Sequence, residues 1–148
     1  MGKEYAAGVW TRGRGLWETR PVSTPVELAR SLWDALGSAG LEALRPLVTD
    51  DVQWRPWGDH GRPLVGLEEI VAWHRAQGAG SHVVVHRWEV FGGCALASGS
   101  LRVFRTGGFY DVQPTWAFFF RDERLERAVC YASRDDALAA VEAFATVS

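Results

Sequence analysis

Most of the predicted sheet lies in residues 95–132, ALASGSLRVFRTGGFYDVQPTWAFFFRDERLERAVCYA. β-Branched and aromatic residues are frequent in this stretch, and turn residues interrupt it twice, at the Gly-Gly pair of 107–108 and at 121–123. This spacing is typical of strands that are joined by tight hairpins and therefore pair antiparallel. It predicts three long antiparallel strands, at 95–105, 109–120 and 125–132.

Helical spacing of apolar residues replaces strand patterning in the N-terminal half. Thr24 and Glu27 form a capping box around Pro25, which suits the first position of a helix. The apolar residues that follow repeat at helical spacing until glycines at 37 and 40 end the helix. The same reasoning predicts helices at 41–48 and 66–77, strands at 51–57 and from residue 83, and a hairpin at 92–93.

The order of these elements predicts an α+β fold. Two helices, a strand and a third helix precede three or four long antiparallel strands, and a short C-terminal helix follows, capped by Ser133 and Asp136. We expect the helices to be segregated to one face of a curved sheet. A chain of 148 residues has the size of one domain, which we place at 24–148. Residues 1–23 are expected to form an N-terminal arm, flexible or docked on a neighbour or on the domain itself.

Composition excludes several classes of protein. The net charge of −2 gives no electrostatic reason to expect nucleic-acid binding. No stretch approaches the roughly 18 apolar residues of a membrane helix, and the first twenty residues lack the apolar core of a signal peptide. Two cysteines without CxxC spacing suggest a reduced, cytoplasmic protein. His82 and His86 are separated by about 13 Å of predicted strand, which is too far for both to bind one ion, so we expect no metal site. We expect no cofactor either.

Tryptophan is the one unusual feature of the composition, with eight residues. Aromatic walls with few polar groups suit a flat hydrophobic ligand in a cavity. The outer face of a sheet that forms a homodimer interface also favours tryptophan and tyrosine. The sequence leaves both explanations open. The tryptophans are residues 10, 17, 33, 54, 57, 73, 88 and 116.

Several short motifs in the expected order resemble the nuclear transport factor 2-like superfamily, and most closely its SnoaL-like branch of polyketide cyclase-like and ketosteroid isomerase-like proteins. The resemblance covers roughly residues 25–145 and implies a cone-shaped, strongly curved, mostly antiparallel sheet with three helices packed on it around an apolar cavity. It also implies a homodimer through the outer face of the sheet. The motifs are SLWDALGSAGLEAL at 31–44, TDDVQW at 49–54, PLVGLEEI at 63–70, FRDERL at 120–125 and YASRDDALA at 131–139.

The resemblance does not extend to the catalytic residues of ketosteroid isomerases. The general-base aspartate of that family precedes a proline, and its place here falls on Arg55 or on Pro56. The family's helix-1 tyrosine falls on Leu32, and its protonated aspartic acid falls near Trp116. Isomerisation by that machinery is therefore disfavoured, and the aspartate–arginine–aspartate arrangement of the related epoxide hydrolases has no clear match either.

Three residues are the candidates for acid–base chemistry: His74, Asp59 and Tyr131. His74 lies on the predicted helix face and titrates near neutral pH, unless it is simply bonded to water or backbone at the helix edge. Asp59 lies in a glycine-rich loop that the resemblance places near the cavity mouth; the alternative is a surface loop. Tyr131 or Cys130 should lie across the sheet from Trp116, and we expect Cys130 to be an inert buried thiol. Tyr131, Tyr110 or Arg55 would stabilise the negative charge that develops on a substrate oxygen. The candidate ligand-binding residues are Trp54, Arg55, Trp57, Trp73, Trp88, Tyr110, Trp116 and Phe118.

Three kinds of function fit these observations. The first is a cofactor-free cyclase, isomerase or hydrolase that acts on a small hydrophobic substrate of polyketide, steroid or terpenoid type. The second is a protein that binds such a ligand without turnover. The third is a homodimeric interaction module whose cavity is filled by its own side chains.

Overall fold

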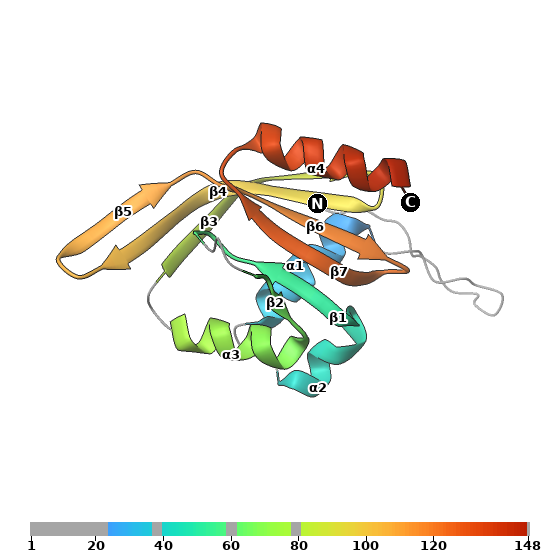
Figure 1. Ribbon diagram of the computed structural model, residues 1–148, viewed down its shortest axis with the longest axis horizontal. Coiled ribbons are helices and arrows are strands. Elements are labelled where there is room, and N and C mark those ends of the chain that lie inside the picture. The colour runs from blue at the N-terminus through green and yellow to red at the C-terminus, as the bar shows by residue number, and fades with distance from the viewer. Residues whose placement is uncertain (1–23, 37–39, 59–61, 78–80, 148) are drawn as a thin grey trace, which may run out of the picture.

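The computed structural model describes residues 24–36, 40–58, 62–77 and 81–147. A strongly bent, seven-stranded sheet forms its centre, with α1, α2 and α3 on one side and α4 on the other (Figure 1). The elements are α1 (Pro25–Leu36), α2 (Leu41–Leu44), the 3-10 turn η1 (Arg45–Leu47), β1 (Val48–Arg55), β2 (Leu64–Val65), α3 (Leu67–Gln77), β3 (Ser81–Phe91), β4 (Cys94–Arg105), β5 (Gly108–Val112), β6 (Thr115–Arg121), β7 (Arg124–Tyr131) and α4 (Arg134–Val147).

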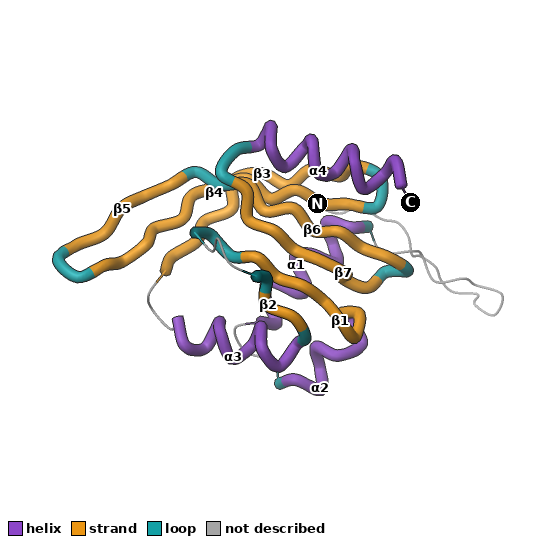
Figure 2. Tube along the Cα trace, viewed as in Figure 1, coloured by secondary structure: helices purple, strands orange, loops and turns teal. Residues whose placement is uncertain are grey.

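The strands follow the order β2-β1-β7-β6-β4-β3, and β5 pairs with the free half of β4. All neighbouring strands pair antiparallel except β1 and β7, which are parallel. The hairpin of β4 and β5 extends away from the rest of the sheet (Figure 2). The predicted α+β fold with a curved, mostly antiparallel sheet is confirmed.

Capping interactions fix where two helices begin. The backbone N–H of Thr24 donates to the Glu27 carboxylate at 2.9 Å, and the N–H of Glu27 donates to the Thr24 hydroxyl at 3.1 Å, which confirms the capping box of α1. At α4 the N–H of Asp136 donates to the Ser133 hydroxyl at 3.1 Å. These contacts satisfy N–H groups that have no partner within their own helix.

Residues 109–120 do not form the single strand that we predicted. They divide at Gln113 and Pro114 into β5 and β6. Proline has no N–H to donate to a strand ladder, so pairing with β4 stops there and restarts at Thr115. The three predicted hairpins form, with turns at 92–93, 106–107 and 122–123; the second turn comes one residue before the predicted Gly107–Gly108 pair, because Gly108 already begins β5.

A β-bulge in β3 determines which side chains point into the fold. The register with β4 shifts between Val85 and Arg87, so His86 is an extra residue. Side chains alternate along a strand, and one extra residue reverses that alternation. As a result Val85 and Trp88 both pack against the same core, although they are three residues apart.

The buried residues form two layers. The inner layer lies between the sheet and the helices α1 to α3; the outer layer lies between the sheet and α4. Our expectation that the helices share one face is therefore wrong for α4, which has 14 residues and is longer than predicted. Strands β6 and β7 carry apolar side chains on both faces, such as Phe118 inside and Phe119 outside, and α4 covers the second face.

Candidate functional site

An aromatic wall lines the inner layer; we define it as Trp33, Trp54, Trp88, Trp116 and Phe118. Helix α1 brings Trp33 to 5.2 Å from Trp116, 5.7 Å from Phe118 and 6.4 Å from Trp88, measured between ring centroids. Trp54, Trp116 and Phe118 are buried, whereas Trp33 and Trp88 keep partly exposed edges. Part of the wall is therefore buried, and the edges of Trp33 and Trp88 are accessible to solvent.

His74 lies against one end of this wall. Its ring centroid is 4.9 Å from that of Trp54 and 5.2 Å from that of Trp73, with both pairs close to perpendicular. Helix α3 aligns His74 with Ile70, four residues earlier on the same face, and Ile70 is buried in the inner layer. Trp73 is partly exposed and flanks the outer side of the imidazole.

The hydrogen bond of His74 fixes its tautomer. Its Nδ1 lies 3.1 Å from the carbonyl oxygen of Ile70, which can only accept, so Nδ1 carries the proton. Nε2 then keeps its lone pair, and no described residue hydrogen-bonds it. Burial lowers the pKa of His74 below its usual 6.5, so the ring is neutral at pH 7. A neutral imidazole with an available Nε2 can act as a general base.

A second cluster lies on the inner side of the β4–β5 hairpin; we call Trp57, Tyr110 and Arg105 the Tyr110 cluster. Arg105 Nη2 donates to the Tyr110 hydroxyl at 3.0 Å, and the Trp57 side chain lies beside the same hydroxyl. The hydrogen bond from Arg105, which is the largest effect, and the neighbouring Trp57 lower the pKa of Tyr110. The neighbouring Asp111 points to the outer side, where it binds Arg102 at 2.8 Å.

Tyr131 and Arg55 lie on the opposite side of the sheet from the aromatic wall. The register places Cys130 across from Trp116 and Tyr131 across from Thr115, which settles the choice that the sequence left open. Tyr131 packs in the outer layer, and Arg55 pairs with Val129 of that same layer. Burial raises the pKa of Tyr131, while Arg127 and Arg55 act against it. The structure therefore does not bring Tyr131 or Arg55 to His74.

The remaining predicted residues are placed as follows. Asp59 lies outside the described residues. Cys130 packs against the inner layer, and burial raises the pKa of its thiol to about 12. His82 and His86 lie on a strand, as predicted, and His86 bonds Ser100 at 3.0 Å on the sheet surface.

Sequence reasoning missed two site residues. Trp33 is at the centre of the wall, and its signal was present: it follows Ala29 by four residues, on the buried face of α1. Arg105 was not recognised in the sequence because an exposed arginine at the end of a strand is not in itself a sign of a functional site. Its signal was the hairpin at 107–108, which places Arg105 and Tyr110 on the same face of neighbouring strands.

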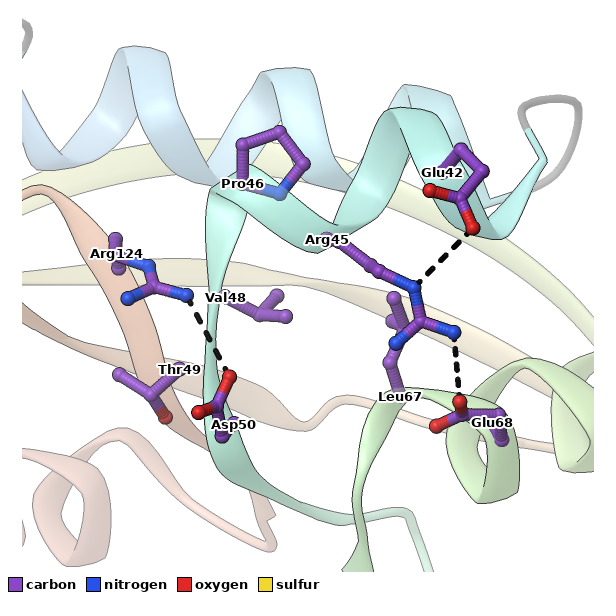
Figure 3. Close-up of a pocket in the computed structure, with 9 residues that line it drawn as sticks. All are labelled: Glu42, Arg45, Pro46, Val48, Thr49, Asp50, Leu67, Glu68 and Arg124. Atoms are coloured by element: carbon purple, nitrogen blue, oxygen red, sulfur yellow. Dashed lines mark hydrogen bonds and ion pairs between the residues drawn. The ribbon is translucent and has the colours of Figure 1, made fainter.

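A groove of about 580 Å³ lies elsewhere, between η1, β1 and the start of α3 (Figure 3). Arg45 crosses it to reach Glu68 at 2.7 Å and Glu42 at 3.5 Å, and Arg124 lies 4.0 Å from Asp50. Its lining is largely polar and includes none of the residues predicted from the sequence. It is therefore not the predicted aromatic cavity.

In the part of the chain that the structure describes, no three or more His, Cys, Asp or Glu side chains gather in a way that could hold a metal ion. No helix among the described residues is long and apolar enough to cross a membrane.

Solved structures define the class of this fold, since 219 chains match it. A candidate polyketide cyclase from Pseudomonas putida is 17% identical, with 78% of this chain and 96% of that chain covered and a TM-score of 0.56. An NTF2-like protein from Burkholderia xenovorans is 16% identical, with 80% and 98% covered and a TM-score of 0.63. TerC, co-crystallised with polyporic acid, is 16% identical, with 81% and 99% covered and a TM-score of 0.59. At these identities the likeness shows the fold alone, the NTF2-like α+β cone.

The sequence itself shows the family. Residues 29–128 match the model of the SnoaL-like domain, and this chain belongs to that family. A search of curated proteins found no matching relative. Membership does not name a reaction, because one fold hosts many chemistries.

Proposed function

We propose that this protein binds a flat hydrophobic molecule of polyketide, steroid or terpenoid type against the aromatic wall and moves a proton on it through His74. The reaction class is that of a cofactor-free cyclase, isomerase or hydrolase. The observation that carries the proposal is the placement of His74: a neutral ring between Trp54 and Trp73, with Nδ1 bonded to the Ile70 carbonyl and Nε2 available. TerC, a protein of the same fold, was co-crystallised with a small molecule, polyporic acid.

The proposed chemistry follows from this environment. Tryptophan faces supply apolar area but no proton acceptor, because the indole N–H is a donor only. Nε2 of His74 is then the group that takes a proton from a C–H or O–H bond of a ligand lying on the wall. The protonated ring gives that proton back, so no cofactor is consumed. Since Nδ1 is held by a backbone carbonyl, the ring keeps its orientation through both steps.

Binding and proton transfer can be measured separately. Saturable quenching of tryptophan fluorescence by polycyclic and terpenoid compounds reports binding. Deuterium uptake from D₂O next to the ketone of 2-tetralone, followed by NMR, reports proton transfer. We expect the native protein to accelerate exchange and His74→Gln to bind 2-tetralone but lose the acceleration. His82→Gln, on the exposed start of β3, is the matched control and keeps it.

The outcome also decides between the alternatives. Saturable binding with no accelerated exchange favours a ligand-binding protein without turnover, an alternative supported by the missing isomerase carboxylates. The absence of saturable binding across the panel contradicts both pocket hypotheses. It leaves the homodimeric interaction module, with the inner layer filled by its own aromatic side chains.

We further propose that the chain forms a homodimer through the outer face of β3, β4 and β5, which α4 leaves open. Val84, Phe104 and Phe109 are exposed there, by 43%, 47% and 54%. The two phenylalanine rings lie 6.1 Å apart, and the Arg102 guanidinium lies 3.9 Å from the Phe109 ring centroid. An apolar centre beside an arginine is typical of protein interfaces. Sedimentation velocity should show a dimer that Phe109→Lys converts to monomer; Val65→Lys, at an equally exposed valine of β2, should not.

The predicted cytoplasmic location also remains a proposal. Cys94 and Cys130 are free thiols, which fits a reducing compartment. Fractionation of cells that produce the tagged chain would test it.

A further inference from the structure

Tyr110 lies on the inner side of the sheet, the side that carries the aromatic wall. It is two residues from Val112 on β5, and Val112 packs against the inner layer. Alternate residues of a strand share a face, so Tyr110 faces the same way. Its hydroxyl reaches Trp57, which packs against the inner layer as well. The phenol is partly exposed and therefore accessible to a ligand.

The hydrogen bond from Arg105 limits the direction of the hydroxyl proton. Arg105 Nη2 lies 3.0 Å from the Tyr110 oxygen, and the guanidinium carbon lies 5.0 Å from the ring centroid. Arginine has donors and no acceptor, so Arg105 donates to the Tyr110 oxygen. The proton of the hydroxyl therefore points away from Arg105.

We infer that Tyr110 donates this proton in a hydrogen bond to a negatively charged oxygen of the ligand, and that Arg105 is the positioning residue that orients it. The inference rests on the proposed function and narrows its substrate class to flat hydrophobic anions with a carboxylate, enolate or phenolate oxygen. A charged acceptor is preferred because such hydrogen bonds are about twice as strong as neutral ones. The permanent positive charge of Arg105 beside the hydroxyl also favours a negatively charged ligand.

The ligand has to reach both polar groups. His74 contacts Trp54, and Tyr110 lies beside Trp57, three residues further along the chain. Three residues of chain span at most about 10 Å. A ligand of several fused rings is long enough to place its charged oxygen at Tyr110 and the bond that reacts near His74.

Calorimetry with two ligands of the same shape tests the inference. The probes are anthracene-2-carboxylate and the neutral anthracene-2-carboxamide. We expect the native protein to bind the carboxylate at least about tenfold more tightly, since a hydrogen bond to a charged group contributes that much. Tyr110→Phe should lose about tenfold for the carboxylate and little for the amide. Tyr131→Phe, on the other side of the sheet, should change neither affinity.

Arg105 is tested by a spectroscopic signal that a merely structural role would not move. The pKa of Tyr110 can be measured from the ultraviolet absorbance of its phenolate. In Arg105→Met this pKa should rise towards its ordinary value, and Arg105→Lys should restore part of the lowering. A Tyr110 titration that is unchanged in Arg105→Met overturns the role of Arg105.

The remaining outcomes separate the two proposals. Equal affinity for both probes in the native protein, or equal losses for both in Tyr110→Phe, overturns the inference and leaves the aromatic site intact. Failure of both probes to bind overturns the inference together with the proposed function.

Discussion

Replacing Gly99 by alanine should break the close approach of β3 and β4 that the bulge requires. A Cβ at this position would lie 2.0 Å from the Val84 carbonyl oxygen and 2.9 Å from the Val85 Cα. Both are backbone atoms, so no side-chain rotation can relieve the contact. The neighbouring strand itself has to move by about 1.4 Å to reach an ordinary separation of 3.4 Å.

The cost of that movement can be worked out from the pairs it disturbs. Gly99 pairs with Val85, and the next pair joins Ser100 to Val84. Two weakened ladder hydrogen bonds cost about 1 kcal/mol each, and overpacking adds about 1–3 kcal/mol. We therefore expect Gly99→Ala to lower the free energy of unfolding by about 3–5 kcal/mol. That is a large part of the roughly 5–15 kcal/mol that stabilises a typical domain.

Urea unfolding followed by tryptophan fluorescence measures this loss, because Trp88 follows the bulge directly. Gly93→Ala is the matched control: it lies at the β3–β4 hairpin, and its Cβ would meet the Phe120 carbonyl oxygen at 3.7 Å, an ordinary contact. We expect the control to stay within about 0.5 kcal/mol of the native protein. If Gly99→Ala is as stable as Gly93→Ala, the strands do not approach as described, and the bulge does not explain how Trp88 reaches the aromatic wall.

Three further predictions concern buried or paired groups. Because burial lowers the pKa of His74, the unfolded chain takes up this proton at a higher pH than the folded protein does. The free energy of unfolding from urea melts should therefore fall as the pH drops below 6.5, by up to about 1.4 kcal/mol per pH unit. His74→Phe should remove this pH dependence. Glu89 is 13% exposed and accepts hydrogen bonds of 2.9 and 2.7 Å from Arg134. Glu89→Gln should therefore lower the free energy of unfolding, measured by calorimetry, by about 1–2 kcal/mol. Asp111→Asn, at the exposed pair with Arg102, should lower it little. Cys130 is partly exposed, but burial raises its pKa to about 12, so it should react with a thiol reagent at pH 8 far more slowly in the native protein than after unfolding; equal rates would contradict the raised pKa.

Local signals in the sequence were sufficient for most of the fold. The capping box at Thr24 and the turn signals of the hairpins act over two to four residues; the capping box forms as predicted, and each hairpin forms within one residue of its predicted position. The face on which a side chain lies depends instead on long-range register. The extra residue at His86 puts Val85 and Trp88 on one side, and the pairing of Trp116 with Cys130 puts Tyr131 on the other.

The same distinction explains why only part of the candidate site was predictable. His74 could be assigned because helical spacing places it on the face of Ile70. The partners of Tyr110 could not, because Trp57 and Arg105 come from a strand end and a neighbouring strand that only the bent sheet brings together. Residue types indicated the chemistry of each group, while the curvature of the sheet determined which groups meet.

An aromatic wall alone cannot orient a flat ligand, because dispersion and burial are nearly the same after the ligand is reversed end for end. The described site is polar at two different points, and the two differ in kind. Near Trp54 it offers a neutral proton acceptor on His74; near Trp57 it offers a donor on Tyr110 beside a fixed positive charge. If both proposals hold, a ligand with one anionic oxygen has one preferred direction, with that oxygen at Tyr110 and its other end at Nε2 of His74. Orientation of this kind is what a proton-transfer enzyme needs beyond simple binding, and it is why the acid–amide comparison at Tyr110 bears on catalysis as well as on affinity.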